Sequence, residues 1–280
     1  MYYPNGRRKP LIWFKIAHMD SVSLLEALKA TPVAAARYFA SIGSTNDEAL
    51  AWADAGAADF SLVLADEQTK GRGRFQRHWV TNAGAALAFS LILQPQPVEM
   101  EHLALFAPLC GLALRDALER CYGLQAEIKW PNDVLLAQCK TAGILVEAAW
   151  AGSQPAGIVL GIGVNISRGS LPPQEARLFP ATCLEEHTTA PLNRMELLAE
   201  LLNAIAGWRR ELGRPRFFSE WQRYLAFKGQ RVRIEDSQKT SIIGIVKGIN
   251  SQGNIVLSLE DGRDMDFAVG DVHLRPMEQL

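Results

Sequence analysis

The chain has 280 residues, enough for one large domain and a small one, and hydrophobic residues make up 48% of it, as in globular proteins with a buried core. The formal net charge is −1, so the whole-chain charge does not point to nucleic acid or an anionic membrane as a partner. The four cysteines lack CxxC spacing, no apolar run has the length of a membrane span, and the basic N-terminus does not resemble a signal peptide. We therefore expect a cytoplasmic protein with reduced thiols.

Periodic apolar residues predict a mixed α/β unit that follows an N-terminal extension over residues 1–35. Within that extension only Ser23–Lys29 has helical spacing. The predicted elements that follow are, in chain order, strand Ala35–Ile42, helix Ser44–Ala55, strands Ser61–Ala65 and Ala85–Leu93, helix Glu101–Cys121, strands Gln125–Trp130, Asp133–Leu136, Ala142–Ala149 and Gly157–Ile162, and helices Asn193–Leu212 and Pro215–Leu225.

The first of these helices has clear signals at both ends. Ser44 or Thr45 is expected to cap its start, and the spacing of Thr45 and Glu48 fits a capping box. Gly56 is expected to stop it.

After Lys228 the pattern changes to short β-rich runs separated by Gly, Asn and Asp turns. The predicted strands are Arg231–Glu235, Ser241–Lys247, Ile255–Leu259 and Met265–Val269. We expect a mixed-sheet α/β (α+β) domain over residues 36–226, followed by a small all-β barrel over residues 227–280.

The segment Gln68–Trp79 has the composition of an anion-binding loop. It holds four basic residues and no acidic one, and these are Lys70, Arg72, Arg74 and Arg77. Gly71 and Gly73 let the backbone approach a ligand closely, so N–H groups and guanidinium groups together suit a phosphate. Trp79 offers a flat face for a purine. A solvated basic loop is the alternative, but GRGR joined to a nearby tryptophan directly after a strand favours phosphate binding.

Two further segments are expected to face the same cleft. Lys129-Trp-Pro-Asn-Asp133 predicts a corner at a strand end, where Asn132 and Asp133 lie side by side; for these two residues alone an ordinary turn is the alternative. Lys140 opens an otherwise apolar strand seven residues beyond Asp133, and Gly143 marks a close approach of that strand to another group.

The segment Gly161-Ile-Gly-Val-Asn165 is a glycine-rich strand end that carries one amide. By itself it is equally compatible with close packing between secondary-structure elements.

Taken in order, Ser44-Thr-Asn46, GRGR with Trp79, KWPND, KxxGIL and GxGxN resemble the catalytic domain of the biotin protein ligases. The resemblance runs from about residue 38 to the C-terminus, where the barrel ends in Leu274-Arg275. It implies a class II synthetase-like biotin/lipoate ligase fold with a mixed sheet, followed by a C-terminal SH3-like β-barrel.

Two features depart from the family pattern. The family's loop reads GRGRxGRxW, and Gln76 here replaces its third glycine. A glutamine at a position of positive φ costs roughly 1 kcal/mol. The first 35 residues also lack two consecutive predicted helices, so we expect a monofunctional ligase without a DNA-binding domain and without DNA as a partner.

The resemblance implies activation of biotin by ATP to biotinyl-5'-AMP, with Mg²⁺ on the polyphosphate, and transfer of biotin to a lysine of a biotin carboxyl carrier protein. The carrier would be a subunit of acetyl-CoA carboxylase or of a related carboxylase. The implied catalytic residues are Lys140, Arg72 and Asp133, where Asp133 orients or deprotonates the incoming lysine. The residues implied to bind biotin or ATP are Ser44, Thr45, Asn46, Gln68, Gly71, Arg72, Gly73, Arg74, Trp79, Asn132, Lys140, Gly143, Asn165 and Arg275.

Two alternatives remain at this point. A lipoate ligase or octanoyl transferase shares the implied fold, although KWPND followed by KxxGIL argues for the biotin branch. A biotin-responsive binding protein without turnover belongs to another class, and the intact Lys140 argues against it. A homodimer formed through a sheet edge is a further expectation.

Overall fold

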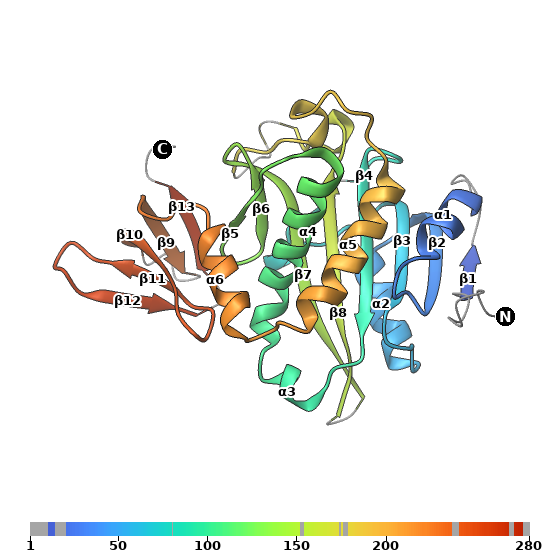
Figure 1. Ribbon diagram of the computed structural model, residues 1–280, viewed down its shortest axis with the longest axis horizontal. Coiled ribbons are helices and arrows are strands. Elements are labelled where there is room, and N and C mark those ends of the chain that lie inside the picture. The colour runs from blue at the N-terminus through green and yellow to red at the C-terminus, as the bar shows by residue number, and fades with distance from the viewer. Residues whose placement is uncertain are drawn as a thin grey trace.

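The computed structural model describes residues 11–14, 21–79, 81–151, 154–173, 175, 179–236, 241–268 and 272–276, which form two sheets (Figure 1). The large sheet has the strand order β1-β2-β3-β4-β8-β7-β6-β5. Its strands are β1 Leu11–Phe14, β2 Ala35–Ile42, β3 Ser61–Gln68, β4 Ala86–Leu93, β5 Glu127–Lys129, β6 Asp133–Leu136, β7 Cys139–Ala151 and β8 Gln154–Asn165. The first three strands are parallel and the others pair antiparallel, so the predicted mixed sheet is confirmed.

Helices cover both faces of the large sheet. They are α1 Ser21–Leu28, α2 Thr45–Asp54, α3 Pro97–Met100, α4 Phe106–Tyr122, α5 Arg194–Arg209 and α6 Pro215–Arg223. Apolar residues of α1, α4 and α5 form the larger core cluster with one face, and α2 forms a separate cluster with the opposite face (Figure 1). Neighbouring strand residues alternate between the faces, so Tyr38 packs in the first cluster and Phe39 in the second.

The start of α2 is set by Ser44, whose side chain accepts a hydrogen bond from the backbone N–H of Asp47. Ser44 was one of the two predicted caps. The predicted capping box of Thr45 and Glu48 is wrong, because the carboxylate of Glu48 pairs with Arg37 at 2.8 Å. The helix ends where Gly56 adopts a φ of 83°. The N-terminal end of α2 is thereby fixed beside the end of β3.

Several elements differ from their predicted bounds. The long helix begins at Phe106 rather than Glu101, because a 3-10 turn over Leu103–Leu105 precedes it. The strands β7 and β8 form a long hairpin that extends beyond the predicted strands at both ends. The strand β1 was not predicted; it pairs in parallel with β2, so a segment of the N-terminal extension joins the large sheet.

The small sheet is antiparallel, with the order β12-β11-β10-β9-β13. Its strands are β9 Arg231–Asp236, β10 Ser241–Ile249, β11 Ile255–Ser258, β12 Asp264–Phe267 and β13 Val272–Pro276. The last of these was not predicted, and the predicted end of the fourth run, Val269, lies outside the described residues. The buried Trp130 donates from Nε1 to the carbonyl of Gly253 at 3.1 Å, which fixes the small sheet against the Lys129–Asp133 corner. The domain bounds at residues 36, 226 and 227 stay a prediction.

Candidate active site

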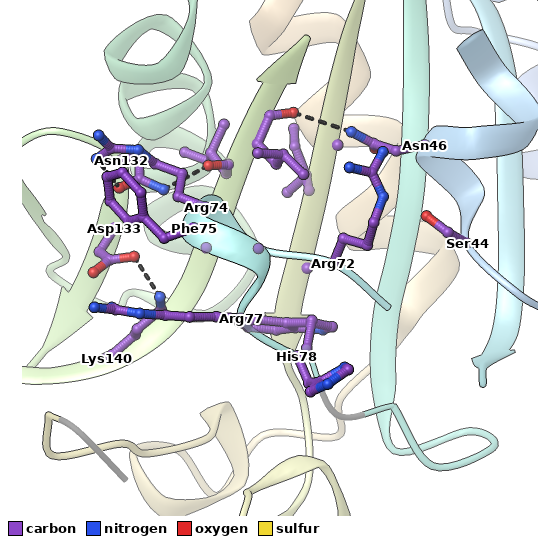
Figure 2. Close-up of a pocket in the computed structure, with 18 of the residues that line it drawn as sticks. Ser44, Asn46, Arg72, Arg74, Phe75, Arg77, His78, Asn132, Asp133 and Lys140 are labelled. Carbon is purple, nitrogen blue, oxygen red and sulfur yellow. Dashed lines mark hydrogen bonds and ion pairs between the residues drawn. The ribbon is translucent and has the colours of Figure 1, made fainter. Parts of the chain in front are cut away.

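A pocket opens on the sheet face that carries α2, between the N-terminal end of that helix and the Lys129–Asp133 corner (Figure 2). Side chains along β7 and β8 alternate between the two faces of the sheet. Gly143, Leu145 and Gly161 therefore lie on the same face as Val159, which packs against α2. The structure brings twelve predicted residues together around the pocket, and these are Ser44, Thr45, Asn46, Gln68, Arg72, Gly73, Arg74, Trp79, Asn132, Asp133, Lys140 and Gly143.

Three predicted residues do not line the pocket. The carbonyl of Gly71 accepts a hydrogen bond from the backbone N–H of Trp79 at 2.9 Å. Asn165 is buried and donates from Nδ2 to the carbonyl of Thr182 at 3.1 Å. The guanidinium of Arg275 lies 4.0 Å from Glu235, while its neighbour Leu274 lines the pocket.

One side of the pocket is polar and carries no net charge. Both the backbone N–H and the hydroxyl of Thr45 donate to Oε1 of Gln68, at 2.8 and 3.0 Å. The hydroxyl of Ser90 lies 2.8 Å from Oγ1 of Thr45 and 2.6 Å from Oδ1 of Asn46. These groups are held in fixed orientations by one another, so they suit a rigid, neutral ligand group with several donors and acceptors.

The glycine-rich loop bends back on itself at a 3-10 turn over Arg74–Gln76. The backbone N–H of Gly73 donates to the carbonyl of Arg77 at 2.7 Å and closes this turn. The left-handed residue in the turn is Phe75, with φ 56° and ψ 40°, rather than Gln76 as the family pattern suggested. The backbone strain of the loop is therefore carried by Phe75.

The structure separates the two arginines to which the sequence analysis gave similar roles (Figure 2). The guanidinium of Arg72 lies beside Asn46 and forms two hydrogen bonds with Glu147, of 3.0 and 2.8 Å. The guanidinium of Arg74 lies on the other side, where it donates to Oδ1 of Asn132 at 3.3 Å. Two positive groups thus face the pocket from opposite sides.

Next to Asn132, one carboxylate lies between two lysines. Oδ1 of Asp133 is 2.5 Å from Nζ of Lys140, and Oδ2 is 3.4 Å from Nζ of Lys129. Burial by itself raises the pKa of Asp133, but the two lysines outweigh it and hold that pKa below its ordinary value. Burial lowers the pKa of Lys129, and Asp133 offsets this only in part. The carboxylate therefore stays ionised and is a weak proton acceptor.

Trp79 covers the glycines of the sheet between these two sides. A Cβ added to Gly163 would lie 2.4 Å from the indole ring, and one added to Gly143 would lie 3.2 Å from it. The ring centroid is 5.7 Å from Nζ of Lys140. The indole Nε1 is buried against Gly163 and has no hydrogen-bond partner within the described part of the chain.

Sequence reasoning missed Lys129, Gly161 and Gly163 as site residues. The signals were present, because Lys129 opens the KWPND segment and the glycines belong to GxGxN. Their role depends on strand register, which brings Gly163 opposite Gly143 and Gly161 opposite Leu145.

Comparisons with known proteins identify the class to which this fold and site belong. A family model described as the Biotin/lipoate A/B protein ligase family matches residues 38–165, and one described as the Biotin protein ligase C terminal domain matches residues 227–275. The chain is similar to the biotin protein ligase from Aquifex aeolicus in complex with biotin and ATP, with a TM-score of 0.75 and 27% identity over 86% of this chain and 98% of that one.

Curated relatives agree with this class. A biotin--[acetyl-CoA-carboxylase] ligase from Mycobacterium tuberculosis is 34% identical over 84% of this chain and 88% of that protein. One from Paracoccus denitrificans is 35% identical over 79% of this chain and 93% of that protein. The bifunctional ligase/repressor BirA of Bacillus subtilis is 29% identical, and the match covers 68% of it.

The chain belongs to the biotin/lipoate A/B protein ligase family. Within that family it is a biotin protein ligase, an enzyme that activates biotin with ATP and transfers it to a lysine of a biotin carboxyl carrier protein. The predicted fold class and activity are thereby confirmed. Within the described ranges, no helix has the length and apolar character needed to cross a membrane.

Proposed function

We propose that the pocket binds biotin and ATP end to end, with the biotin head at the α2 side and the reacting groups at the Asp133–Lys140 side. The observation that carries this proposal is that one pocket joins a neutral hydrogen-bonding cluster to a cationic corner. Biotin's ureido group has one acceptor and two donors, and Ser44, Thr45 and Gln68 supply matching neutral partners. A ligand without a ureido group would leave these buried groups unpaired, which argues against lipoate.

In the first half-reaction a carboxylate oxygen of biotin attacks the α-phosphorus of ATP. A new P–O bond forms, the bond between the α-phosphorus and the bridging oxygen breaks, and pyrophosphate leaves. Negative charge accumulates on the phosphate in the transition state, and fixed positive groups stabilise it without reorganisation. Lys140 is the proposed principal group, and Arg72 and Arg74 hold carboxylate and phosphate oxygens from opposite sides.

In the second half-reaction the ε-amine of the carrier lysine attacks the carbonyl carbon of the mixed anhydride. The C–N bond forms, the C–O bond to AMP breaks, and a proton leaves the amine. The low pKa of Asp133 favours the proposal that this carboxylate orients the incoming amine rather than accepting its proton. Asn132 is held beside it, because its Nδ2 donates to the carbonyl of Ile144 at 2.7 Å.

The glycine-rich loop is proposed to act as a lid over the adenylate, with Trp79 as the shelf for adenine. The loop carries several like charges that a bound adenylate neutralises, so ligand binding favours closure and shields the anhydride from water. The backbone of Gly143 is a further proposed contact. Three residues are proposed to act indirectly. Gly71 acts through the shape of the loop, Asn165 through its contact with Thr182, and Arg275 through the small sheet.

Mg²⁺ is proposed to enter the pocket with the ATP polyphosphate rather than to have its own protein site. The residues described by the structure contain no group of three His, Cys, Asp or Glu side chains that could hold a metal ion. Asp133 is already engaged by two lysines. Mg²⁺ binds through phosphates and a few carboxylates in many nucleotide enzymes, and it would share the polyphosphate charge here.

We propose that the carrier belongs to acetyl-CoA carboxylase or a related carboxylase. We also propose that the protein is cytoplasmic, that it forms a homodimer through a sheet edge, and that it has no role in DNA binding.

Pyrophosphate release tests the substrate assignment directly. The protein is mixed with Mg-ATP and either biotin or lipoate, without a carrier. Release of pyrophosphate with biotin but not with lipoate supports the proposal. Release with lipoate at an equal rate would contradict the role given to Thr45 and Gln68.

A further inference from the structure

Glu147 is an acidic residue that contacts both Asn46 and Arg72 on the α2 side of the pocket. It lies on β7, on the same face as Gly143 and Leu145, and its side chain is 27% exposed. Its carboxylate receives two hydrogen bonds from the guanidinium of Arg72, at 3.0 and 2.8 Å, and one from Nδ2 of Asn46, at 2.8 Å. A bidentate arginine–carboxylate pair fixes both the distance and the plane of the guanidinium.

Asn46 links this pair to the neutral cluster. Its Oδ1 lies 2.6 Å from the hydroxyl of Ser90, which also lies 2.8 Å from the hydroxyl of Thr45. Its Nδ2 donates to Glu147. Asn46 is 4% exposed and its amide packs directly on Gly161, where an added Cβ would lie 2.0 Å from Oδ1. Both of its polar atoms are thus engaged by the protein, and a run of polar contacts leads from Thr45 through Ser90, Asn46 and Glu147 to Arg72.

Arg72 keeps donors for a ligand in this arrangement. A guanidinium has five N–H groups. Glu147 takes two of them and Asp47, at 2.8 Å from Nη2, takes a third. Among the described residues, no acceptor contacts Nε or the second hydrogen of Nη1. Arg72 lines the pocket, and Glu147 therefore fixes its guanidinium without taking all of the donors that an oxyanion could use.

We propose that Glu147 is a positioning residue of this ligase: through Asn46 and Arg72 it couples the site of the biotin head to the arginine that receives the biotin carboxylate. The inference rests on the proposed assignment of the head to Thr45 and Gln68. When the biotin head binds, it fixes the position of Asn46 through Ser90. Asn46 then fixes the carboxylate of Glu147, and this carboxylate orients the guanidinium of Arg72 in the loop.

The test compares steady-state kinetics of Glu147→Gln, Arg72→Gln and the double variant, with Asp47→Asn as the matched control. Loss of one charge-assisted contact changes affinity by roughly tenfold. We expect E147Q to raise the KM for biotin by about that factor and to leave the KM for ATP within about twofold. R72Q should raise the KM for biotin to a similar extent, and the double variant should be no worse than R72Q, because the two residues act as one unit.

The side chain of Asp47 also contacts Arg72, but it is 59% exposed, so D47N should change the KM for biotin by less than about twofold. Glu147→Asp, which keeps the charge, should recover part of the loss. An unchanged KM for biotin in E147Q, or effects of E147Q and R72Q that multiply in the double variant, would overturn the inference.

Gln68→Ala separates this inference from the site assignment on which it rests. If Q68A raises the KM for biotin and E147Q does not, the inference alone fails. If Q68A leaves it unchanged, the assignment of the biotin head fails. R72Q probes the same link from the exposed loop, so the test does not depend on the folding of E147Q.

Discussion

Nζ of Lys140 lies 2.5 Å from Oδ1 of Asp133 on the neighbouring strand, at the edge of the pocket where β6 and β7 pair. The two residues are seven positions apart in sequence, and a register shift between Val134 and Leu135 brings them together. A lysine held in this way is oriented before substrate arrives, so its contribution to catalysis requires no rearrangement of its own. We propose that this preorganised lysine drives the formation of the adenylate.

Replacing Lys140 by alanine should reduce biotin-dependent ATP–pyrophosphate exchange by a factor on the order of 10² to 10³, because a fixed charge next to the developing phosphate charge is lost. Lys70→Ala is the control, since Lys70 is an exposed lysine of the glycine-rich loop and does not line the pocket. K70A should retain exchange within about twofold. Equal losses of exchange in both variants would mean that the loss of any positive charge, and not of Lys140 in particular, lowers the rate.

Replacing Lys129 by methionine should change the pH dependence of carrier biotinylation. Burial raises the pKa of Asp133, but the two lysines lower it by more, so that the pKa lies below its ordinary value. The wild-type carboxylate therefore stays ionised on mild acidification. Without Lys129 that pKa rises, and the carboxylate gains a proton at a higher pH. We expect the acid decline of kcat/KM to begin at a higher pH in K129M than in the wild type. Parallel profiles would contradict the role given to Lys129.

The same pair predicts the pH dependence of stability. A carboxyl whose pKa is lowered by folding stabilises the folded state above its unfolded pKa, and this contribution is lost as the pH falls through the folded pKa. For Asp133 the loss therefore begins below about pH 4, the ordinary range of an aspartate. Denaturant titrations of the wild type and of Asp133→Asn should differ at neutral pH and converge in acid. A difference that persists unchanged in acid would contradict this.

Gly161→Ala tests the close packing at the biotin side. Its new Cβ would lie 2.0 Å from Oδ1 of Asn46, a residue that is 4% exposed, so the amide would have to shift. We expect the Kd for biotin to rise roughly tenfold or more, because a displaced positioning group has effects of this size. Gly207→Ala is the control, since nothing lies within 4 Å of a Cβ at that position in α5. Calorimetric titration with biotin alone measures both, and similar affinities in the two variants would refute the packing argument.

The proposed lid should become ordered when the adenylate forms. Hydrogen exchange of the backbone amides in Lys70–Trp79 should slow in the presence of biotin and ATP, whereas exchange in α4 should not change. Equal exchange in the loop with and without ligands would rule out closure. Arg74→Ala provides a control with the same backbone and one fewer charge to neutralise.

The sequence predicted elements whose pattern is local and missed relationships that depend on register. The bounds of β2 and β6 match the structure because each is an uninterrupted run with clear punctuation on both sides. Lys129 was not recognised, because its contact with Asp133 depends on the turn at Pro131 and on burial by distant segments. Likewise, the effect of Gln76 was misplaced by one residue: the positive φ falls on Phe75, and a sequence alone does not specify which residue of a short turn adopts it.

The most direct test of the role of Lys140 incubates the wild-type protein and K140A with biotin, ATP, Mg²⁺ and a biotin carboxyl carrier domain, and then measures the mass of the carrier. A matched carrier with arginine in place of the target lysine reports the site of transfer. We expect the wild type to add one biotinyl group to the lysine carrier and none to the arginine carrier, and K140A to add almost none in the same time. Equal labelling by the wild type and K140A would contradict it.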